Sequence, residues 1–464
     1  MDFKPEYIKE EKINFDVSFE YDKSRVRIET GVTFDKNNII LISASNEIPT
    51  RLEVKPHIKK IESKAFYECK KLESISLPDS IEFIGERAFA LCSNLRSFIF
   101  PPRLKKIKEY TFLQCENLEL VIFSDVIEEI GEGCFKQEGK VSGLEKDPKL
   151  CNINLPLNLK KIGEYAFANC FSLREVNFKR NIENIGVGAF EWCVNIEQLD
   201  LLDTNIKCLP AQIFLGCYKL KEINLSNSLI EIGEEAFRFC SSIEIIDIPE
   251  GVEYIGTKAF EECQSIKKIN LPSSLKYIGD NAFKDCIALE EIVLPESLIE
   301  IGYGIFENCV SLHSVDIQSK NISIEKNTFK NCKALNSISF SDSLLEIKDN
   351  AFEGCINLET LQLPYSLIRL CNSVFKGCSL LKKIHIPDNV FELWDSVFED
   401  CISLIEIKFP TSTKFLGDKV FQNCLSLESC EFSKELQGIG KDIFKGCNLL
   451  KNVNIPKSFN VNKL

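Results

Sequence analysis

The fold is decided by a stretch that recurs along the chain: Leu275-Lys-Tyr-Ile278-Gly279-Asp-Asn-Ala282-Phe283-Lys-Asp-Cys286-Ile-Ala-Leu289-Glu-Glu-Ile292-Val-Leu294-Pro295. Its second half, Leu-x-x-Ile-x-Leu, alternates apolar and polar residues, as a strand that is buried on one face does. The glycine stands before the phenylalanine, where a tight bend or a close approach of two backbones favours a residue without a side chain. The proline after the strand ends hydrogen-bonded pairing. The stretch therefore predicts one strand followed by a return.

The pattern repeats along the chain with a period of 23 residues, as between Phe260 and Phe283. Two steps are longer, one of 24 residues into Phe214 and one of 32 residues into Phe167, where the segment Glu138 to Asp147 is inserted. Such an insertion predicts a surface loop on a regular stack. The seventeen copies are marked by Phe66, Phe89, Phe112, Phe135, Phe167, Phe190, Phe214, Phe237, Phe260, Phe283, Phe306, Phe329, Phe352, Phe375, Phe398, Phe421 and Phe444.

A single copy cannot bury its own apolar positions, so neighbouring copies must stack to close a continuous core. Strands of successive copies then pair in parallel about 4.8 Å apart, which makes the array roughly 80 Å long. The predicted fold is a solenoid, a curved right-handed coil with a parallel β-sheet on its concave face. Short helical turns or irregular returns are expected on its convex face.

The repeat array is expected to span residues 58–456. Residues 1–57 are expected to form an N-terminal extension and a degenerate capping coil, since the segment Phe34 to Ser43 looks like an incomplete copy and terminal copies need cover. Residues 457–464 form a short C-terminal tail. The last copy is therefore poorly capped, and its open strand edge allows end-to-end self-association of two chains.

The motif Ile-Gly-x-x-Ala-Phe-x-x-Cys-x-x-Leu-x-x-Ile-x-Leu-Pro, found almost without deviation around Phe260 and Phe283, resembles the BspA-like class of leucine-rich repeat. The resemblance covers Ile58 to Pro456 and identifies the predicted coil as a leucine-rich-repeat solenoid. Two copies depart from the pattern: one has Glu138 in place of its cysteine, and the segment Leu201 to Pro210 is closer to an ordinary leucine-rich repeat. Neither departure is expected to break the stack.

The resemblance implies an adhesive protein of the cell surface. Members of this family are known from surface antigens of oral and gut bacteria and from parasitic protozoa. They are taken to bind host proteins or neighbouring microbes. A host or microbial surface protein is therefore the partner that the resemblance implies.

The charge of the chain argues against nucleic acid as a partner. Its 56 Lys and Arg residues face 69 Asp and Glu residues, which gives a net charge of −13, whereas a phosphate backbone needs clustered basic residues. Met1 to Ser24 lack the apolar segment of a secretory signal, and no apolar run approaches the ~18 residues of a membrane-spanning helix. The residues alone thus favour the cytoplasm, while the resemblance implies the cell surface, and both locations stay open.

Cysteine is abundant, with 21 residues, sixteen of which follow the phenylalanine by three positions in what we call the cysteine column. No Cys-x-x-Cys pair suggests zinc or a redox centre. Stacked copies bring neighbouring column cysteines to about 5 Å, but parallel side chains have poor geometry for a disulfide. We expect buried, reduced thiols that act as small apolar fillers. Disulfides or a bound metal are the alternative.

Histidine is nearly absent: His57, His313 and His385 lie in well-separated copies. Catalytic groups must lie within hydrogen-bonding reach of one another, so no Cys-His or Ser-His-Asp arrangement can be assembled. The glycines follow the repeat and form no phosphate-binding cluster. The chain is therefore expected not to be an enzyme, and no catalytic residue, cofactor site or metal site is predicted.

Polar residues recur ten positions after the phenylalanine, in the middle of each predicted strand. Short amides suit a parallel sheet because they bond to one another along the stack, which is the structural interpretation. The functional interpretation is a recognition stripe on the concave face, where three glutamates two positions earlier favour a basic partner. The stripe, which we call the polar column, consists of Asn154, Asn177, Asp200, Asn224, Asp247, Asn270 and Asp316, interrupted by Val293, and the glutamates are Glu175, Glu222 and Glu291.

Nearer the N-terminus, outward positions of adjoining strands carry Ile99, Leu120 and Ile122. An exposed apolar cluster often marks a partner site. The alternative is that the loop Glu138 to Asp147 or the N-terminal segment covers these side chains.

Two functions remain at this point. The first is a non-catalytic protein-binding repeat protein of the BspA-like kind that mediates adhesion to host or microbial ligands. The second is an intracellular scaffold or regulatory subunit that uses the same face to bind a cytosolic client protein.

Overall fold

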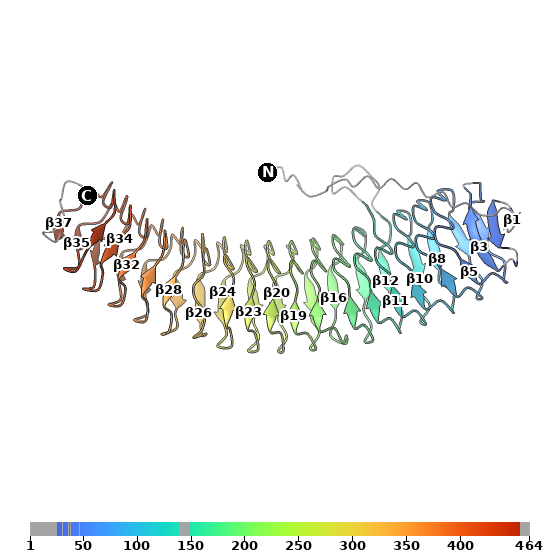
Figure 1. The fold of residues 1–464 in the computed structure, drawn as a ribbon, viewed down its shortest axis with the longest axis horizontal. Helices are drawn as coiled ribbons and strands as arrows, with labels where there is room; N and C mark the ends of the chain where they lie inside the picture. The colour runs from blue at the N-terminus through green and yellow to red at the C-terminus, as the bar shows by residue number, and fades with distance from the viewer. Residues whose placement is uncertain are drawn as a thin grey trace.

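The computed structural model describes residues 26–454, apart from residues 30, 36, 38, 46 and 139–147. These residues wind into one long coil that bends so that its two ends lie toward the same side (Figure 1). The expected surface loop lies outside the described residues except for Glu138, and the tail 457–464 lies outside them entirely. The predicted leucine-rich-repeat solenoid is confirmed.

Each turn of the coil contributes one strand of three or four residues at the predicted Leu-x-x-Ile-x-Leu position. Equivalent residues of neighbouring turns pair in parallel, for example Glu175 with Asn152 and Asn177 with Asn154. Alternate side chains of these strands point outward, and the surface that they make is called here the long-strand face. The long strands are β4 (Arg51–Glu53), β6 (Ser74–Ser76), β8 (Ser97–Ile99), β10 (Leu120–Ile122), β12 (Asn152–Asn154), β14 (Glu175–Asn177), β16 (Gln198–Asp200), β18 (Glu222–Asn224), β20 (Ile245–Asp247), β22 (Lys268–Asn270), β24 (Glu291–Leu294), β26 (Ser314–Ile317), β27 (Ser337–Ser339), β29 (Thr360–Gln362), β31 (Lys383–His385), β33 (Glu406–Lys408), β35 (Ser429–Glu431) and β37 (Asn452–Asn454).

A second ladder of two-residue strands, which the sequence pattern did not predict, precedes the glycine of most turns. Tyr254 pairs with Tyr277 and Ile255 with Ile278, the isoleucine being buried and the first residue facing outward. The surface on this side of the coil is called the short-strand face. The short strands are β5 (Lys60–Ile61), β7 (Phe83–Ile84), β9 (Lys106–Ile107), β11 (Glu129–Ile130), β13 (Lys161–Ile162), β15 (Asn184–Ile185), β17 (Cys208–Leu209), β19 (Glu231–Ile232), β21 (Tyr254–Ile255), β23 (Tyr277–Ile278), β25 (Glu300–Ile301), β28 (Glu346–Ile347), β30 (Arg369–Leu370), β32 (Glu392–Leu393), β34 (Phe415–Leu416) and β36 (Gly438–Ile439).

The return around each phenylalanine is irregular, and the part of the chain that the structure describes contains no helix. Residues two before and two after the phenylalanine have left-handed backbones, with φ of 55° at Asn281 and 59° at Asp285. A helix needs an unbroken right-handed run, so these residues prevent one. The N–H groups point along the stack instead: Asn281 and Phe283 donate to the carbonyls of Tyr303 and Ile305 in the next turn. The helical alternative for the returns is therefore not found.

The phenylalanines form one continuous stack through the core. The ring of Phe283 lies 5.5 Å from that of Phe260 and 5.6 Å from that of Phe306, with interplanar angles of 10° in both pairs. The rings from Phe66 to Phe421 are buried. Burial of one such side chain contributes roughly 1.5–3 kcal/mol, and ring contacts add about 0.5–1.5 kcal/mol. The core is thus a nearest-neighbour structure in which each turn depends on the two beside it.

The cysteine column lies beside the phenylalanine stack, and all 21 cysteines are free thiols. The Sγ of Cys286 donates to the carbonyl oxygen of Phe260 at 3.2 Å, and the Sγ of Cys309 makes the same contact with Phe283. Burial raises the pKa of the Cys115 and Cys170 thiols to about 12. The column thiols from Cys69 to Cys424 are buried in the core, as expected of apolar fillers, and in addition they donate to backbone carbonyls between turns.

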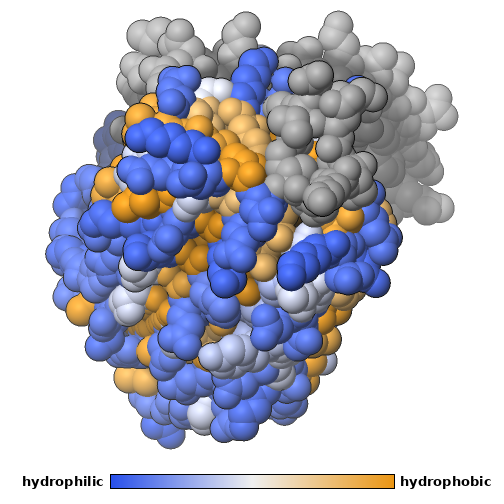
Figure 2. Space-filling view, turned by 90° about the vertical axis from the view of Figure 1, so that its left-hand side faces the viewer, coloured by the Kyte–Doolittle hydropathy of each residue, from blue (hydrophilic) through white to orange (hydrophobic). Residues whose placement is uncertain are grey.

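The first turn is covered by an antiparallel arrangement of β1 (Val26–Glu29), β2 (Val32–Asp35) and β3 (Ile40–Ala44). β3 then pairs in parallel with β5, with Leu41 opposite Ile61. Phe34 and Leu41 are buried against the array. At the other end Phe444 is only partly buried, and apolar surface is visible among polar residues (Figure 2).

Candidate functional site

The polar column lies on the long-strand face, where the strand pattern exposes every second residue. Its members are exposed on strands β12 to β22, and Asp316 on β26 is half-buried. The register brings members of neighbouring turns opposite each other, such as Asp200 with Asn224 and Asp247 with Asn270. Val293 lies opposite Asp316, as expected for the interruption.

Hydrogen bonds along the stack occupy part of the polar column. The Nδ2 of Asn177 donates to the Oδ1 of Asn154 at 2.7 Å, and Asn270 donates to Asp247. These contacts support the structural interpretation for those two pairs. Asn224 makes no side-chain hydrogen bond to another described residue, so its amide is available to a partner.

The three glutamates predicted beside the column are exposed on β14, β18 and β24. Among the described residues no Lys or Arg forms an ion pair with Glu175, Glu222 or Glu291, although Lys268 lies opposite Glu291 in the register. Some glutamates that come just before long strands differ, because each forms an ion pair with a lysine of the neighbouring turn. Lys221 pairs with Glu197 at 3.1 Å and Lys267 with Glu244 at 2.9 Å. The carboxylates of Glu175, Glu222 and Glu291 therefore have no ion-pair partner among the described residues, although Lys268 stands beside one of them.

A shallow groove of about 490 Å³ lies between β18 and β20 on this face. Its walls include Glu222, Asn224, Glu244 and Asp247, and Ile223 and Ile245 also line it. Carboxylate and amide oxygens thus line this hollow together with Lys221, which pairs with Glu197. This is where the column and its glutamates come together.

A larger groove of about 890 Å³ lies over the C-terminal strands β31 to β37 and was missed. It includes Lys383, His385, Lys408 and Glu431. Here the charges compensate one another, since Lys383 pairs with Glu406 at 3.1 Å and Lys408 with Glu431 at 3.4 Å. The outward strand positions that define the polar column continue in the turns after Asp316. Following them further along the sequence would have pointed to this groove.

The predicted apolar patch is exposed on β8 and β10. Ile99 is 63% exposed, Leu120 52% and Ile122 46%, and Ile122 lies opposite Ile99 in the register. The loop that we considered as a cover lies outside the described residues apart from Glu138. The three side chains form a contiguous apolar surface at one end of the long-strand face.

The described residues contain no group of His, Cys, Asp and Glu placed to hold a metal ion. His313 precedes β26 and His385 ends β31, so the two imidazoles belong to different turns. Likewise, no helix within the described ranges has the length and apolarity needed to cross a membrane. What the exposed faces offer is non-covalent recognition through charge, amides and apolar contact.

Comparison with protein families matches residues 45–146, 142–267, 253–382 and 369–463 to the BspA type leucine rich repeat region. The matches together run along nearly all of the array. No curated protein matches the chain.

Among solved structures, a leucine-rich repeat protein from Bacteroides ovatus is similar, with 24% identity and a TM-score of 0.63 over 94% of this chain and 100% of that chain. A leucine rich cell surface protein from Faecalibacterium prausnitzii has 19% identity and a TM-score of 0.39 over 94% of this chain and 96% of that chain. The first likeness shows the fold. Proteins with this fold in general act as scaffolds for protein interaction.

Proposed function

This chain belongs to the BspA-type leucine-rich repeat family, and from that premise we propose that it is a non-catalytic protein that binds a protein partner through its long-strand face. The observation that carries the proposal is that Glu175, Glu222 and Glu291, beside the polar column, form no ion pair with any described residue. Exposed carboxylates without a cation of their own attract a partner that supplies one. The partner is therefore a protein with a basic surface.

The proposed setting is the cell surface, where the partner is a host or microbial protein and the outcome is adhesion. Support comes from the family resemblance. The apolar patch of Ile99, Leu120 and Ile122 adds a second contact at the end of the same face. An extended solenoid can use both regions on one large partner.

One observation favours the intracellular scaffold as a second candidate. All 21 cysteines are free thiols, a state typical of reducing compartments. In this alternative the same face binds a cytosolic client. Labelling of intact cells with a membrane-impermeant biotin reagent separates the two, because only a surface protein is labelled. An expressed protein that stays unlabelled would sink the adhesion proposal.

The face itself is tested with the triple variant Glu175→Gln, Glu222→Gln and Glu291→Gln. Biotinylated surface proteins of candidate host cells are passed over immobilised wild-type or variant protein, and the retained fraction is measured. We expect retention to fall about fivefold or more at low salt, where charge pairing is strongest. A control variant, Glu231→Gln with Glu300→Gln, changes the short-strand face and should retain as much as the wild type. Equal retention by the triple variant contradicts the proposed face.

Self-association is a separate proposal for the C-terminal end. β37 pairs with β35 on one side, and Phe444, Leu450 and Val453 are only partly buried. A second chain that stacked on this end would extend the sheet and cover these side chains. Sedimentation that stays monomeric at all concentrations would reject it.

A further inference from the structure

Glycine is required four residues before the phenylalanine in most turns. At Gly279 an added Cβ would lie 2.4 Å from the backbone nitrogen of Thr257 in the preceding turn, so the two backbones leave no room for a side chain. This glycine column comprises Gly85, Gly131, Gly163, Gly186, Gly233, Gly256, Gly279, Gly302, Gly417 and Gly440. Four consecutive turns break the column, with Glu325, Lys348, Cys371 and Trp394 in its place.

The coil changes where the glycine column stops. The short-strand ladder that ends at β25 is not continuous with the ladder that begins at β28, and the turn between them contributes only an isolated bridge from Ile324 to Ile347. The backbone hydrogen bond at the column position lengthens over the last three of these turns, from 2.9 Å at the Lys348 N–H to 3.2 Å at the Trp394 N–H. This segment is therefore the longest stretch of the array in which side chains replace the glycine column, which is also interrupted singly at Glu62, Lys108 and Pro210.

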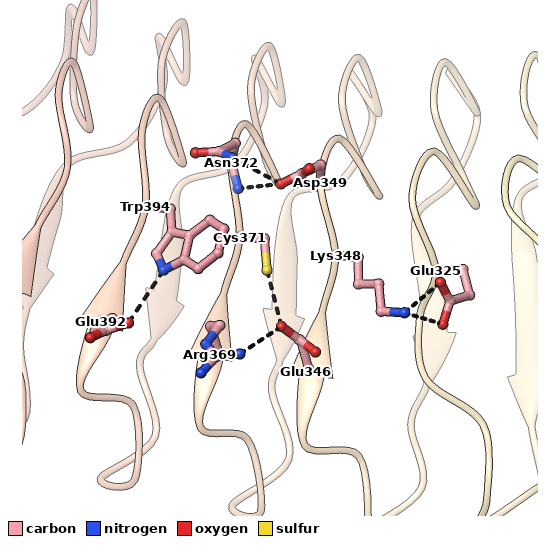
Figure 3. A network of polar contacts seen from close by, with 9 residues as sticks. All are labelled: Glu325, Glu346, Lys348, Asp349, Arg369, Cys371, Asn372, Glu392 and Trp394. Atoms are coloured by element: carbon pink, nitrogen blue, oxygen red, sulfur yellow. Dashed lines mark hydrogen bonds and ion pairs between the residues drawn. The ribbon is translucent and has the colours of Figure 1, made fainter.

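The first three side chains of the segment are engaged in contacts within the chain (Figure 3). Lys348 pairs with Glu325 at 2.6 Å, and the thiol of Cys371 donates to Glu346 at 3.3 Å. Glu346 also pairs with Arg369 at 3.1 Å. The segment is thus held together by charge pairs up to the turn of Arg369.

Trp394 ends the segment and differs from the other three, because it is a large aromatic residue that is 38% exposed. Its indole leans toward the preceding turn, where the guanidinium of Arg369 lies 5.8 Å from the ring centroid. Its Nε1 makes a long contact of 3.4 Å with Glu392. In the following turn the glycine column resumes at Gly417, which lines the same hollow as Trp394.

Phe415 forms the opposite wall. Its ring is 44% exposed and rests against Gly438 of the following turn, where an added Cβ would lie 2.9 Å from Cδ1. The two aromatic rings thus lean apart along the stack. Between them lies a notch of about 320 Å³ lined by Trp394, Phe415, Glu392, Asp395 and Gly417, among others.

Two carboxylates line this notch, those of Glu392 and Asp395. In earlier turns some carboxylates have cationic partners, as Glu129 has in Lys106 at 2.8 Å and Glu253 in Lys276 at 2.8 Å, whereas Glu231 and Glu300 form no ion pair with a described residue. No Lys or Arg within the described ranges forms an ion pair with Glu392 or Asp395, although Arg369, which pairs with Glu346, lies opposite Glu392 in the register. One oxygen of Asp395 accepts the N–H of Asp418 at 2.8 Å, and the other has no hydrogen bond to a described residue.

We propose that the notch between Trp394 and Phe415 binds an arginine side chain of a partner protein. A guanidinium stacks on aromatic faces and pairs with carboxylates through its planar donors, and both features line this notch. An apolar side chain would desolvate Glu392 and Asp395 without pairing them, which is costly. The site lies on a different face from the proposed long-strand interface and does not depend on it.

The test uses tryptophan emission, because the chain has only two tryptophans and Trp192→Phe leaves Trp394 as the sole reporter. The full chain with this change is titrated with acetyl-Arg-Arg-Arg-amide at low salt. We expect a saturable change in emission, a weaker response to the lysine peptide, and none with the citrulline peptide, which has the shape of arginine without its charge.

The variant Glu392→Gln with Asp395→Gln removes the carboxylates, and we expect it to weaken binding of the arginine peptide at least about fivefold. Glu231→Gln with Glu300→Gln, on the same face but in distant turns, should leave binding unchanged. An equal response to citrulline, or unchanged binding by the notch variant, would overturn the proposal. A response to acetyl-Leu-Leu-Leu-amide as strong as that to arginine would also overturn it, in favour of an apolar occupant. The retention experiment with biotinylated surface proteins probes the long-strand face. Its outcome is therefore independent of the outcome of the peptide titration.

Discussion

The thiol of Cys286 donates a hydrogen bond to the backbone carbonyl of Phe260, 3.2 Å away in the preceding turn. The same Phe260 carbonyl also accepts the N–H of Cys263 in its own turn at 3.2 Å. This one oxygen therefore accepts one hydrogen bond from within its own return and a second from the next turn. The two residue types that recur most regularly in this chain are thus coupled through a backbone atom, a contact that a methyl group cannot make.

Replacement of Cys286 by Ala should lower the free energy of unfolding by roughly 1–2 kcal/mol, because it removes a weak hydrogen bond and leaves a small cavity in a buried position. Urea unfolding followed by circular dichroism measures the change. Cys208→Ala serves as the control, since Cys208 is exposed and should change stability by less than about 0.5 kcal/mol. Equal losses at both positions would show that the bond between turns contributes little.

Alkaline pH should destabilise the fold through the buried thiols. Burial raises the pKa of the Cys115 and Cys170 thiols from 9.0 to about 12, so the folded state holds their protons where the unfolded state has lost them. The stabilising contribution is therefore complete below pH 9 and is lost as pH rises toward 12. Urea midpoints at pH 8, 9, 10 and 11 should fall beyond pH 9. The double variant Cys115→Ala with Cys170→Ala should show a shallower fall, and an identical slope would contradict this origin.

Replacement of Phe283 by Ala should cost roughly 3–5 kcal/mol, because a buried ring with a neighbour on each side leaves a cavity in the stack. Phe444→Ala should cost less, since that ring is only partly buried and stacks on one phenylalanine of the column, Phe421, at 5.8 Å. Thermal unfolding of the two variants compares the losses. Equal losses would contradict nearest-neighbour energetics in the coil.

The repeat pattern was sufficient to predict the stack and the long strands, because Phe283 and Ile292 recur in positions that only stacking can bury. The returns were less predictable. Their left-handed residues include Asn281, Lys258 and Trp192, and no single residue type marks them. The second ladder was missed because two residues, as in Tyr277–Ile278, are too short to show alternation.

The outward residues were predicted in position but not in their contacts. The exposure of Asn177 and Glu175 followed from the strand period. The strand period does not show which residue stands one turn away or which way its side chain points. It therefore could not predict that Asn177 bonds to Asn154 while Glu175 lacks a cationic partner. The notch at Trp394 was missed for the same reason, since it exists because Phe415 leans on Gly438 in the next turn.

Replacement of Gly279 by Ala gives the sharpest test of the close packing between turns. An added Cβ would lie 2.4 Å from the nitrogen of Thr257, a backbone atom that cannot move without shifting its whole turn. Gly438→Ala is the matched control, because its nearest atom is Cδ1 of the exposed Phe415 ring at 2.9 Å, which can rotate away. Overpacking against backbone should cost about 1–3 kcal/mol or more at Gly279, and less than about 1 kcal/mol at Gly438. Thermal and urea unfolding measure both variants. If Gly279→Ala were as stable as Gly438→Ala, the glycine column would not be a steric requirement, and its absence from Glu325 to Trp394 would not mark a distinct segment of the coil.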